Sequence, residues 1–219
     1  LLAASTSTGN TAIGYQSMKT ITTAGHGNTA LGYGTLALAT SATGNIAIGL
    51  NAMAANTTGD ANTVIGTDAY KTAQTASGIT AIGYQALSVA QSTATGNSAI
   101  GYQAGAALTT ADESTAVGYR ALASTTTGLW NTAVGNAALA ANVGGSNNTA
   151  VGAGALALPT GQSNNTALGL GAGYSIQGSD NVVIGADAGS GSGGALGSQN
   201  VAIGSGAMRY STGTGNVAI

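Results

Sequence analysis

The chain is built on one phrase, which stands at residues 78–87 as GITAIGYQAL. After a polar stretch the phrase begins again at residues 96–104 as GNSAIGYQA. The glycine after its Ile or Val recurs at steps of 16 to 19 residues, most often 17, at Gly14, Gly32, Gly49, Gly66, Gly83, Gly101, Gly118, Gly135, Gly152, Gly169, Gly185 and Gly204. A fixed period of this length indicates one structural unit per repeat.

The repeats follow one another without a linker or a second domain. We expect residues 1–8 to be the lead-in from a preceding repeat, and residues 9–219 to form about twelve 17-residue repeats plus a truncated thirteenth. The last phrase stops at Ile219, just before its expected glycine, and a fragment of a longer fibre is therefore expected. Twelve rungs at a strand spacing of about 4.8 Å predict a rod about 58 Å long.

Each repeat contains two short apolar pieces, typified by NTAVG at residues 131–135 and ALA at residues 138–140. Both are shorter than the usual helix of about 12 residues. The first is rich in Thr, Val and Ile, which favour strands, and the linking TTG, NN and GG stretches favour turns. The pattern predicts an all-β fold, a parallel β-roll or β-solenoid with about 17 residues and two short strands per coil.

Stacked coils would align like residues in columns. In a strand, successive side chains face opposite ways, so that Ala12 and Gly14 share one face while Thr11, Ile13 and Tyr15 share the other. Both faces carry apolar residues, including Ile82 and Val134, which predicts burial on both sides. One face is expected to be the narrow interior of the coil, where only Ala and Gly fit, and the sequence leaves open which face that is.

Three columns have structural meanings that can be predicted. The repeated glycine is expected to mark a bend where another backbone comes close. Stacked Asn side chains can bond along the array, at Asn10, Asn28, Asn45, Asn62, Asn97, Asn131, Asn148, Asn165, Asn181, Asn200 and Asn216. A Thr column follows directly, at Thr11, Thr29, Thr63, Thr80, Thr115, Thr132, Thr149 and Thr166.

Charge and composition exclude several classes of partner. Charged residues are only 5% of the chain, and the four cations Lys19, Lys71, Arg120 and Arg209 are scattered. They are too few to neutralise a phosphate backbone or to form a polybasic membrane patch. No apolar run approaches the roughly 20 residues of a membrane span. We therefore expect neither nucleic-acid binding nor membrane contact by this segment.

No catalytic, cofactor or metal site is expected. There are no cysteines, and the acidic residues show no spacing suited to paired-carboxylate chemistry or calcium loops: Asp60, Asp68, Asp112, Glu113, Asp180 and Asp187. The one histidine, His26, is expected in an exposed loop, although three copies around a trimer axis would offer a metal or anion site. The many GxG strings lack the strand-to-helix context of a phosphate loop. The chain is therefore predicted not to be an enzyme.

Two columns suggest surface roles. Tyr15, Tyr33, Tyr84, Tyr102 and Tyr119 each follow the motif glycine. They are interpreted either as an aromatic ladder that seals the turn or a subunit interface, or as an exposed strip suited to sugars or a host surface. The Thr column supports a different hypothesis, since regular Thr ladders on a flat solenoid face can bind ice.

The phrase NTAIGYQAL, followed by TTG, resembles the head repeats of trimeric autotransporter adhesins of the YadA type, and still more the related repeats of phage and prophage tail-fibre proteins. The resemblance covers the chain from about Gly9 to Ile219. It implies a left-handed parallel β-roll with three chains around a common axis. The adhesin repeats are shorter, nearer 14 residues, which implies longer loops here, and a monomeric solenoid remains the alternative.

These observations predict a rigid, non-enzymatic segment of an extracellular trimeric fibre that attaches to a host or surface, as an adhesin head or a tail-fibre shaft. Its expected location is a bacterial cell surface or a virion tail. The expected partners are two further copies of the chain and a host-surface glycan or protein. A purely structural filament without a receptor, or a monomeric ice-binding solenoid, remains the alternative.

Overall fold

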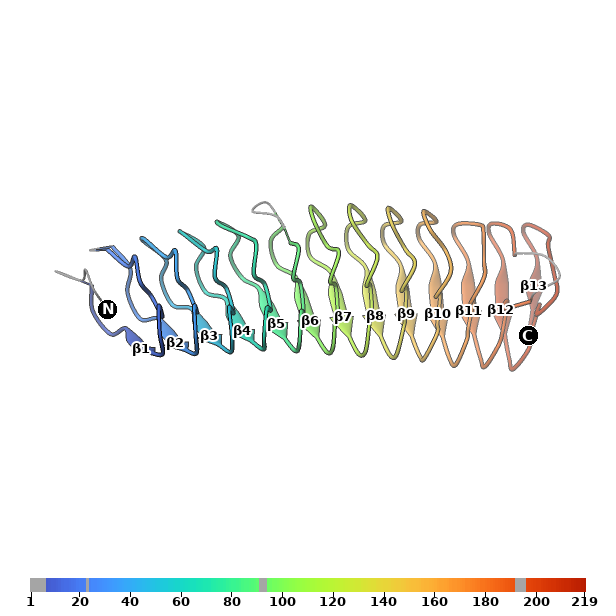
Figure 1. The fold of residues 1–219 in the computed structure, drawn as a ribbon. Coiled ribbons are helices and arrows are strands. Elements are labelled where there is room, and N and C mark those ends of the chain that lie inside the picture. The colour runs from blue at the N-terminus through green and yellow to red at the C-terminus, as the bar shows by residue number, and fades with distance from the viewer. Residues whose placement is uncertain (1–6, 23, 91–93, 192–195) are drawn as a thin grey trace.

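The computed structural model describes residues 7–22, 24–90, 94–191 and 196–219, so that residues 1–6 of the expected lead-in lie outside the described residues. A single sheet of 13 short strands runs the length of the stack, with the two chain ends at its opposite ends (Figure 1). Its strands are β1 (Thr11–Ile13), β2 (Thr29–Leu31), β3 (Ile46–Ile48), β4 (Thr63–Ile65), β5 (Thr80–Ile82), β6 (Ser98–Ile100), β7 (Thr115–Val117), β8 (Thr132–Val134), β9 (Thr149–Val151), β10 (Thr166–Leu168), β11 (Val182–Ile184), β12 (Val201–Ile203) and β13 (Val217–Ala218).

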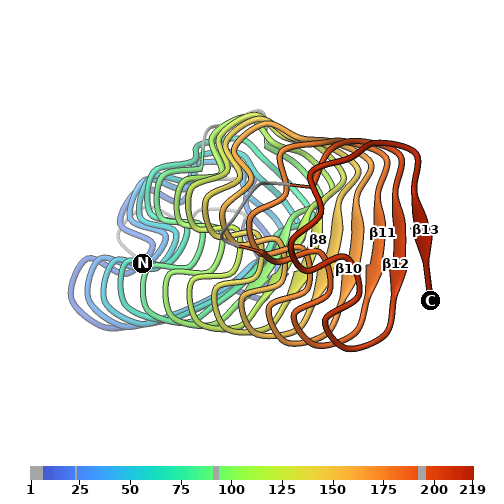
Figure 2. The same cartoon turned by 90° about the vertical axis from the view of Figure 1, so that its right-hand side faces the viewer.

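The strands pair in parallel and in sequence order, with no helix among the described residues. The register places like residues side by side, as where Thr132 pairs with Thr149 and Val134 with Val151. Viewed down the stack, the strands lie over one another along one wall (Figure 2). The predicted parallel β-solenoid of about 12 turns, with about 17 residues per coil, is confirmed. Coils are numbered here by the strand that begins them.

The middle residue of each strand points into the solenoid. Ala30, Ala81 and Ala133 are completely buried, and Val64 and Val183 take the same place in β4 and β11. The two flanking residues of each strand point outward and stay exposed or half-buried. The Ala face is therefore the interior, as its small side chains allow, and the Thr and Ile face is the outside of the wall.

The prediction of a second short strand in each coil is wrong. The described residues contain one strand per coil, and the second apolar piece is a run of turns. Gln85 and Leu87 in this piece have φ angles of 54° and 51°, in the left-handed region, whereas a parallel strand needs φ near −120°. A left-handed residue costs about 1–2 kcal/mol, but burying a leucine contributes about 1.5–3 kcal/mol. The turn aims Leu87 into the core, where it is completely buried.

Large side chains fill the interior of the coils, and in most coils such a side chain stands at the place of Leu87. Three coils have a glycine there instead: Gly105, Gly173 and Gly189. In the first two, Leu108 and Ile176, three residues further on, are buried instead, and in the third Leu196 is buried. A Cβ added to Gly105 would lie 2.7 Å from Leu108 Cδ1. The replacement side chain thus occupies the space that the missing one leaves.

The motif glycine is required by a close approach of backbones, as predicted. Gly14 has φ of 128° and Gly83 has φ of 133°, which L side chains rarely adopt. A Cβ on Gly83 would overlap the carbonyl oxygen of Gly101 in the next coil. Glycine therefore stacks on glycine along the edge of the wall.

The Asn column forms the predicted ladder inside the stack. Asn28 donates its backbone N–H and its side-chain amide to Oδ1 of Asn10, at 2.8 and 3.0 Å. The same amide also donates to the carbonyl of Ala42 at 2.7 Å, across its own coil. Two other residues stand in this column, Ile79 and Ser114, and the hydroxyl of Ser114 still accepts a hydrogen bond from the next coil. Wherever asparagine follows asparagine or serine in the column, it thereby ties its coil to the preceding one.

Candidate functional site

The outer face of the wall is an apolar surface that the single chain leaves uncovered. We use the name outer face for the two residues that flank the middle of each strand. Ile13, Leu31 and Leu168 on it are 59%, 44% and 48% exposed, and Val134 is exposed while Ile82 is half-buried. Burial on both sides of the strands, as the sequence predicts, therefore requires a partner and stays a prediction.

The Thr column lies on this outer face beside the Ile and Val column. Its longest unbroken run is in register over β7 to β10, from Thr115 to Thr166. Elsewhere Ile46 and Ser98 interrupt it, and β11 to β13 carry valine in its place. The face therefore presents one threonine per rung, over four consecutive rungs at most.

The tyrosines that follow the motif glycine form an exposed strip past the bend, here called the tyrosine strip. The rings of Tyr84 and Tyr102 stack at 5.2 Å between centroids, and Tyr102 stacks on Tyr119 at the same distance with an interplanar angle of 11°. Tyr15 and Tyr33 form a second stack at 5.4 Å. Because the rings cover one another, the strip presents ring edges and hydroxyls outward, and ring faces are free only where a stack ends.

A hollow of about 350 Å³ begins where the tyrosine strip ends, and we call it the alanine hollow. Tyr119 and Arg120 line it from coil 7, and Leu158 and Tyr174 line it from coils 9 and 10. Small side chains make up the rest of its lining: Ser124, Ala137, Ala140, Ala141 and Ala157. The position of the strip is occupied by Asn136 and Ala153 in the next two coils, so that no large ring fills the space.

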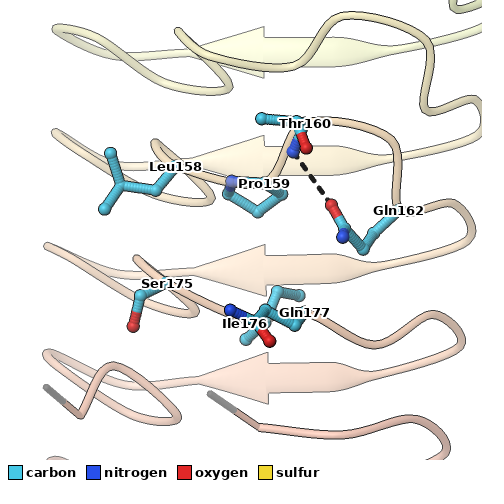
Figure 3. A pocket seen from close by; sticks show the side chains of 7 residues that line it. All are labelled: Leu158, Pro159, Thr160, Gln162, Ser175, Ile176 and Gln177. Carbon is cyan, nitrogen blue, oxygen red and sulfur yellow. Dashed lines mark hydrogen bonds between the residues drawn. The ribbon is translucent and has the colours of Figure 1, made fainter. Parts of the chain in front are cut away.

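A second hollow of about 450 Å³ adjoins the first and shares Leu158 with it (Figure 3). We call it the proline hollow, and it lies between Leu158, Pro159, Thr160 and Gln162 of coil 9 and Ser175, Ile176 and Gln177 of coil 10. The side chain of Gln162 turns back to accept the backbone N–H of Thr160 at 2.9 Å and that of Gly161 at 3.0 Å.

The proline hollow coincides with a break in the hydrogen bonding between coils. In the two preceding steps of the stack, the N–H of Thr126 donates to the carbonyl of Val143, and that of Val143 to the carbonyl of Thr160. The next such bond, from Thr160 to Gln177, is replaced by the contact with Gln162. Among the described residues no hydrogen bond reaches the carbonyl oxygen of Gln177. A residue that lines the hollow therefore has a backbone acceptor without a partner among the described residues.

Two of the acidic residues cap backbone groups of the preceding coil. Asp60 accepts the backbone N–H of Thr43 in the preceding coil at 2.6 Å, and Asp112 accepts that of Thr95 at 2.7 Å. Both aspartates stand eleven residues after a motif glycine, Gly49 and Gly101, so their shared place in the repeat was the signal that could have revealed this capping role. No group of three His, Asp or Glu residues that could hold a metal exists in the described part of the chain.

Two ionisable residues have specific partners. His26 accepts the backbone N–H of Thr8 through Nδ1 at 3.1 Å and is half-buried, not exposed as the sequence predicts. A hydrogen bond from the Asn51 amide lowers the pKa of Asp68, which also pairs with Lys71 at 3.2 Å. Both arrangements are local contacts between neighbouring loops.

No protein-family model matches the chain, and no curated protein is similar to it. Within the described residues, no helix has the length and apolar character needed to cross a bilayer.

Proposed function

We propose that this chain is a rigid, non-enzymatic segment of an extracellular fibre, in which three copies associate through their outer faces and mediate attachment to a host or surface. The observation that carries the proposal is the apolar column of the outer face, which runs in register from Ile13 to Ile203 and is exposed or half-buried throughout. Continuous exposed apolar surfaces of this kind mark sites of association.

A three-fold axis parallel to the stack suits this surface. Each rung of one chain would then meet the equal rungs of its neighbours, so that a column such as the one through Val117 and Val134 is covered along its whole length. A closed ring of three also leaves no apolar face exposed to bind further copies. The proposal includes left-handed coils, as the resemblance to adhesin-head and tail-fibre repeats implies, and a location on a bacterial surface or a virion tail.

Stiffness follows from how the coils are joined. Each coil contacts only its neighbours, through the strand ladder, the Asn ladder and the stacked glycines. Each of these links repeats at nearly every rung, so bending the rod would strain many hydrogen bonds at once. Such a rod suits reach and attachment, and equally a purely structural filament.

Cysteine cross-linking tests the proposed interface, because the chain has no cysteine of its own. Ile100→Cys and Val134→Cys place single thiols on the outer face, and we expect oxidation to give covalent dimers within the trimer. Leu38→Cys is the matched control, since Leu38 is 50% exposed but lies outside the strands. Equal cross-linking of all three variants, or none at the outer face, would contradict the proposal.

A second candidate function is ice binding by a monomer. The unbroken run from Thr115 to Thr166 favours it, since these threonines are aligned on a flat parallel wall. Thermal hysteresis of the purified chain tests it, with Thr132→Leu as the variant that should abolish the effect. A chain that is monomeric and active in this assay would replace the fibre proposal.

A further inference from the structure

We propose that the alanine hollow and the proline hollow together bind an oligosaccharide that carries a sugar carboxylate. The inference deepens the attachment role proposed above and rests on it. The two hollows share Leu158, and their volumes of about 350 and 450 Å³ each lie within the usual range of ligand pockets, about 300–1,000 Å³. A chain of linked sugar rings is long and narrow enough to span both.

The hollows arise where the repeat departs furthest from its own phrase. After Tyr119 the tyrosine strip gives way to Asn136 and Ala153, and the positions that line the floor become alanine. Tyr174 of coil 10 reaches back toward coil 9. Its ring would lie 3.5 Å from a Cβ added to Gly154. Two tyrosines thus stand at opposite ends of a floor of small residues.

Tyr119 offers an exposed aromatic ring at one end of the hollow. Its ring stacks on Tyr102, and no other ring among the described residues contacts it. Tyr119 is 49% exposed and lines the hollow, so part of its ring is open to a ligand there. Aromatic faces carry negative charge density, and the C–H groups on one side of a pyranose ring carry partial positive charge. A sugar ring therefore suits this surface better than a flat anion does.

Arg120 supplies the charge that selects an acidic sugar. Its side chain is exposed and forms no ion pair with any described residue, whereas Lys71 and Arg209 pair with Asp68 and Asp187. No acidic residue lines either hollow. A guanidinium is a planar fork that binds a carboxylate through two parallel hydrogen bonds. On a chain with net charge −2, this hollow is a place where a free cation and apolar surface meet.

The proline hollow provides groups for the hydroxyls of a neighbouring sugar. The carbonyl oxygen of Gln177 is an unpaired acceptor, and the side chains of Thr160 and Gln177 add polar atoms to the lining. Pro159 and Ile176 form the apolar part of its wall. The residues that line the two hollows all lie in the turns and loops between the strands.

Isothermal titration calorimetry of the full chain with a trigalacturonate probe tests the site, with neutral galactotriose as the matched comparison. We expect binding of the acidic trisaccharide and at least about tenfold weaker binding by Arg120→Gln, which loses a charge-assisted hydrogen bond. Ala141→Trp should fill the hollow and abolish binding. Lys19→Gln and Tyr33→Ala, changes of the same kind outside both hollows, should leave the affinity unchanged.

Several results would overturn the assignment. Equal affinity for galactotriose would contradict the role of Arg120, and equal affinity for an acidic peptide would contradict a sugar ligand. Binding that survives Ala141→Trp would place the site elsewhere. The mass of the chain, measured in the same buffer, separates the two proposals: a trimer that does not bind the acidic trisaccharide refutes this site alone, and a monomer that binds it refutes the fibre alone.

Discussion

Removing one asparagine from the buried ladder should strongly destabilise the stack. Asn148 donates its side-chain amide to Asn131 Oδ1 at 3.1 Å and to the carbonyl of Gln162 at 2.9 Å. Its Oδ1 accepts the buried backbone N–H of Asn165 at 3.0 Å and the side-chain amide of Asn165 at 3.3 Å. In Asn148→Ala, three lost hydrogen bonds at about 0.5–1.5 kcal/mol each and one orphaned buried donor at about 1–3 kcal/mol predict a loss of roughly 2.5–7.5 kcal/mol.

Asn148→Ser is the matched control, because a serine already stands at one other position of this column. Ser114 occupies the same column, and its hydroxyl accepts the N–H of Asn131 at 3.2 Å. A serine at position 148 should likewise accept the N–H of Asn165, while the two amide donations are lost. We therefore expect Asn148→Ser to lose only about 1–3 kcal/mol, clearly less than Asn148→Ala.

Urea unfolding at a fixed chain concentration measures both losses, because association also shifts apparent stability. Hydrogen exchange at the Asn165 amide provides a local readout, which should speed up in Asn148→Ala and change little in Asn148→Ser. Equal destabilisation by the two substitutions, or an Asn165 amide that stays protected in Asn148→Ala, would refute the assignment of the free energy to the ladder.

Three further changes follow from single contacts. Gly83→Ala should lower stability by several kcal/mol, since its Cβ would overlap the Gly101 carbonyl oxygen, and an unchanged melting temperature would contradict the stacked-glycine bend. Tyr70→Phe should raise stability by about 1 kcal/mol, because the tyrosine hydroxyl is buried, which raises its pKa, and has no hydrogen-bond partner. A lower melting temperature for the variant would argue against that environment. The lowered pKa of Asp68, due first to the Asn51 amide, means that its contribution to stability is present above the ordinary pKa of 3.8 and is lost as the pH falls through the lower folded value. In Asp68→Asn the free energy of unfolding should therefore fall less steeply as the pH is lowered through this range. A fall as steep as in the unchanged chain would exclude this role.

The period and the columns of the fold were predictable from sequence because each coil repeats the same chemistry. An alanine such as Ala81 in the middle of most strands indicated a narrow interior, although the sequence left open which face that was, and Gly83 at a bend follows from the close approach of two backbones. The second apolar piece was predicted wrongly because the preference of Leu87 for ordinary backbone angles is weaker than the gain from burying it. Local preference gave way to packing between coils.

The hollows could not be predicted, although their signals are present in the sequence. The tyrosine strip ends after Tyr119, the chain has its one proline at Pro159, and coil 10 has Gly173 where most coils have a large residue. Each signal alone reads as tolerated variation in a repeat. Only the stacking of coils brings Tyr119, Arg120 and Tyr174 to the same concave surface.

The central claim is that the outer face is covered by other copies of this chain, and the solution mass tests it most directly. Light scattering at several concentrations should give three times the chain mass of 20.6 kDa for the unchanged protein. Val134→Asp should shift that mass toward one chain, because a charge would be buried without a partner at the interface. A mass of one chain for the unchanged protein, at every concentration, would contradict the account.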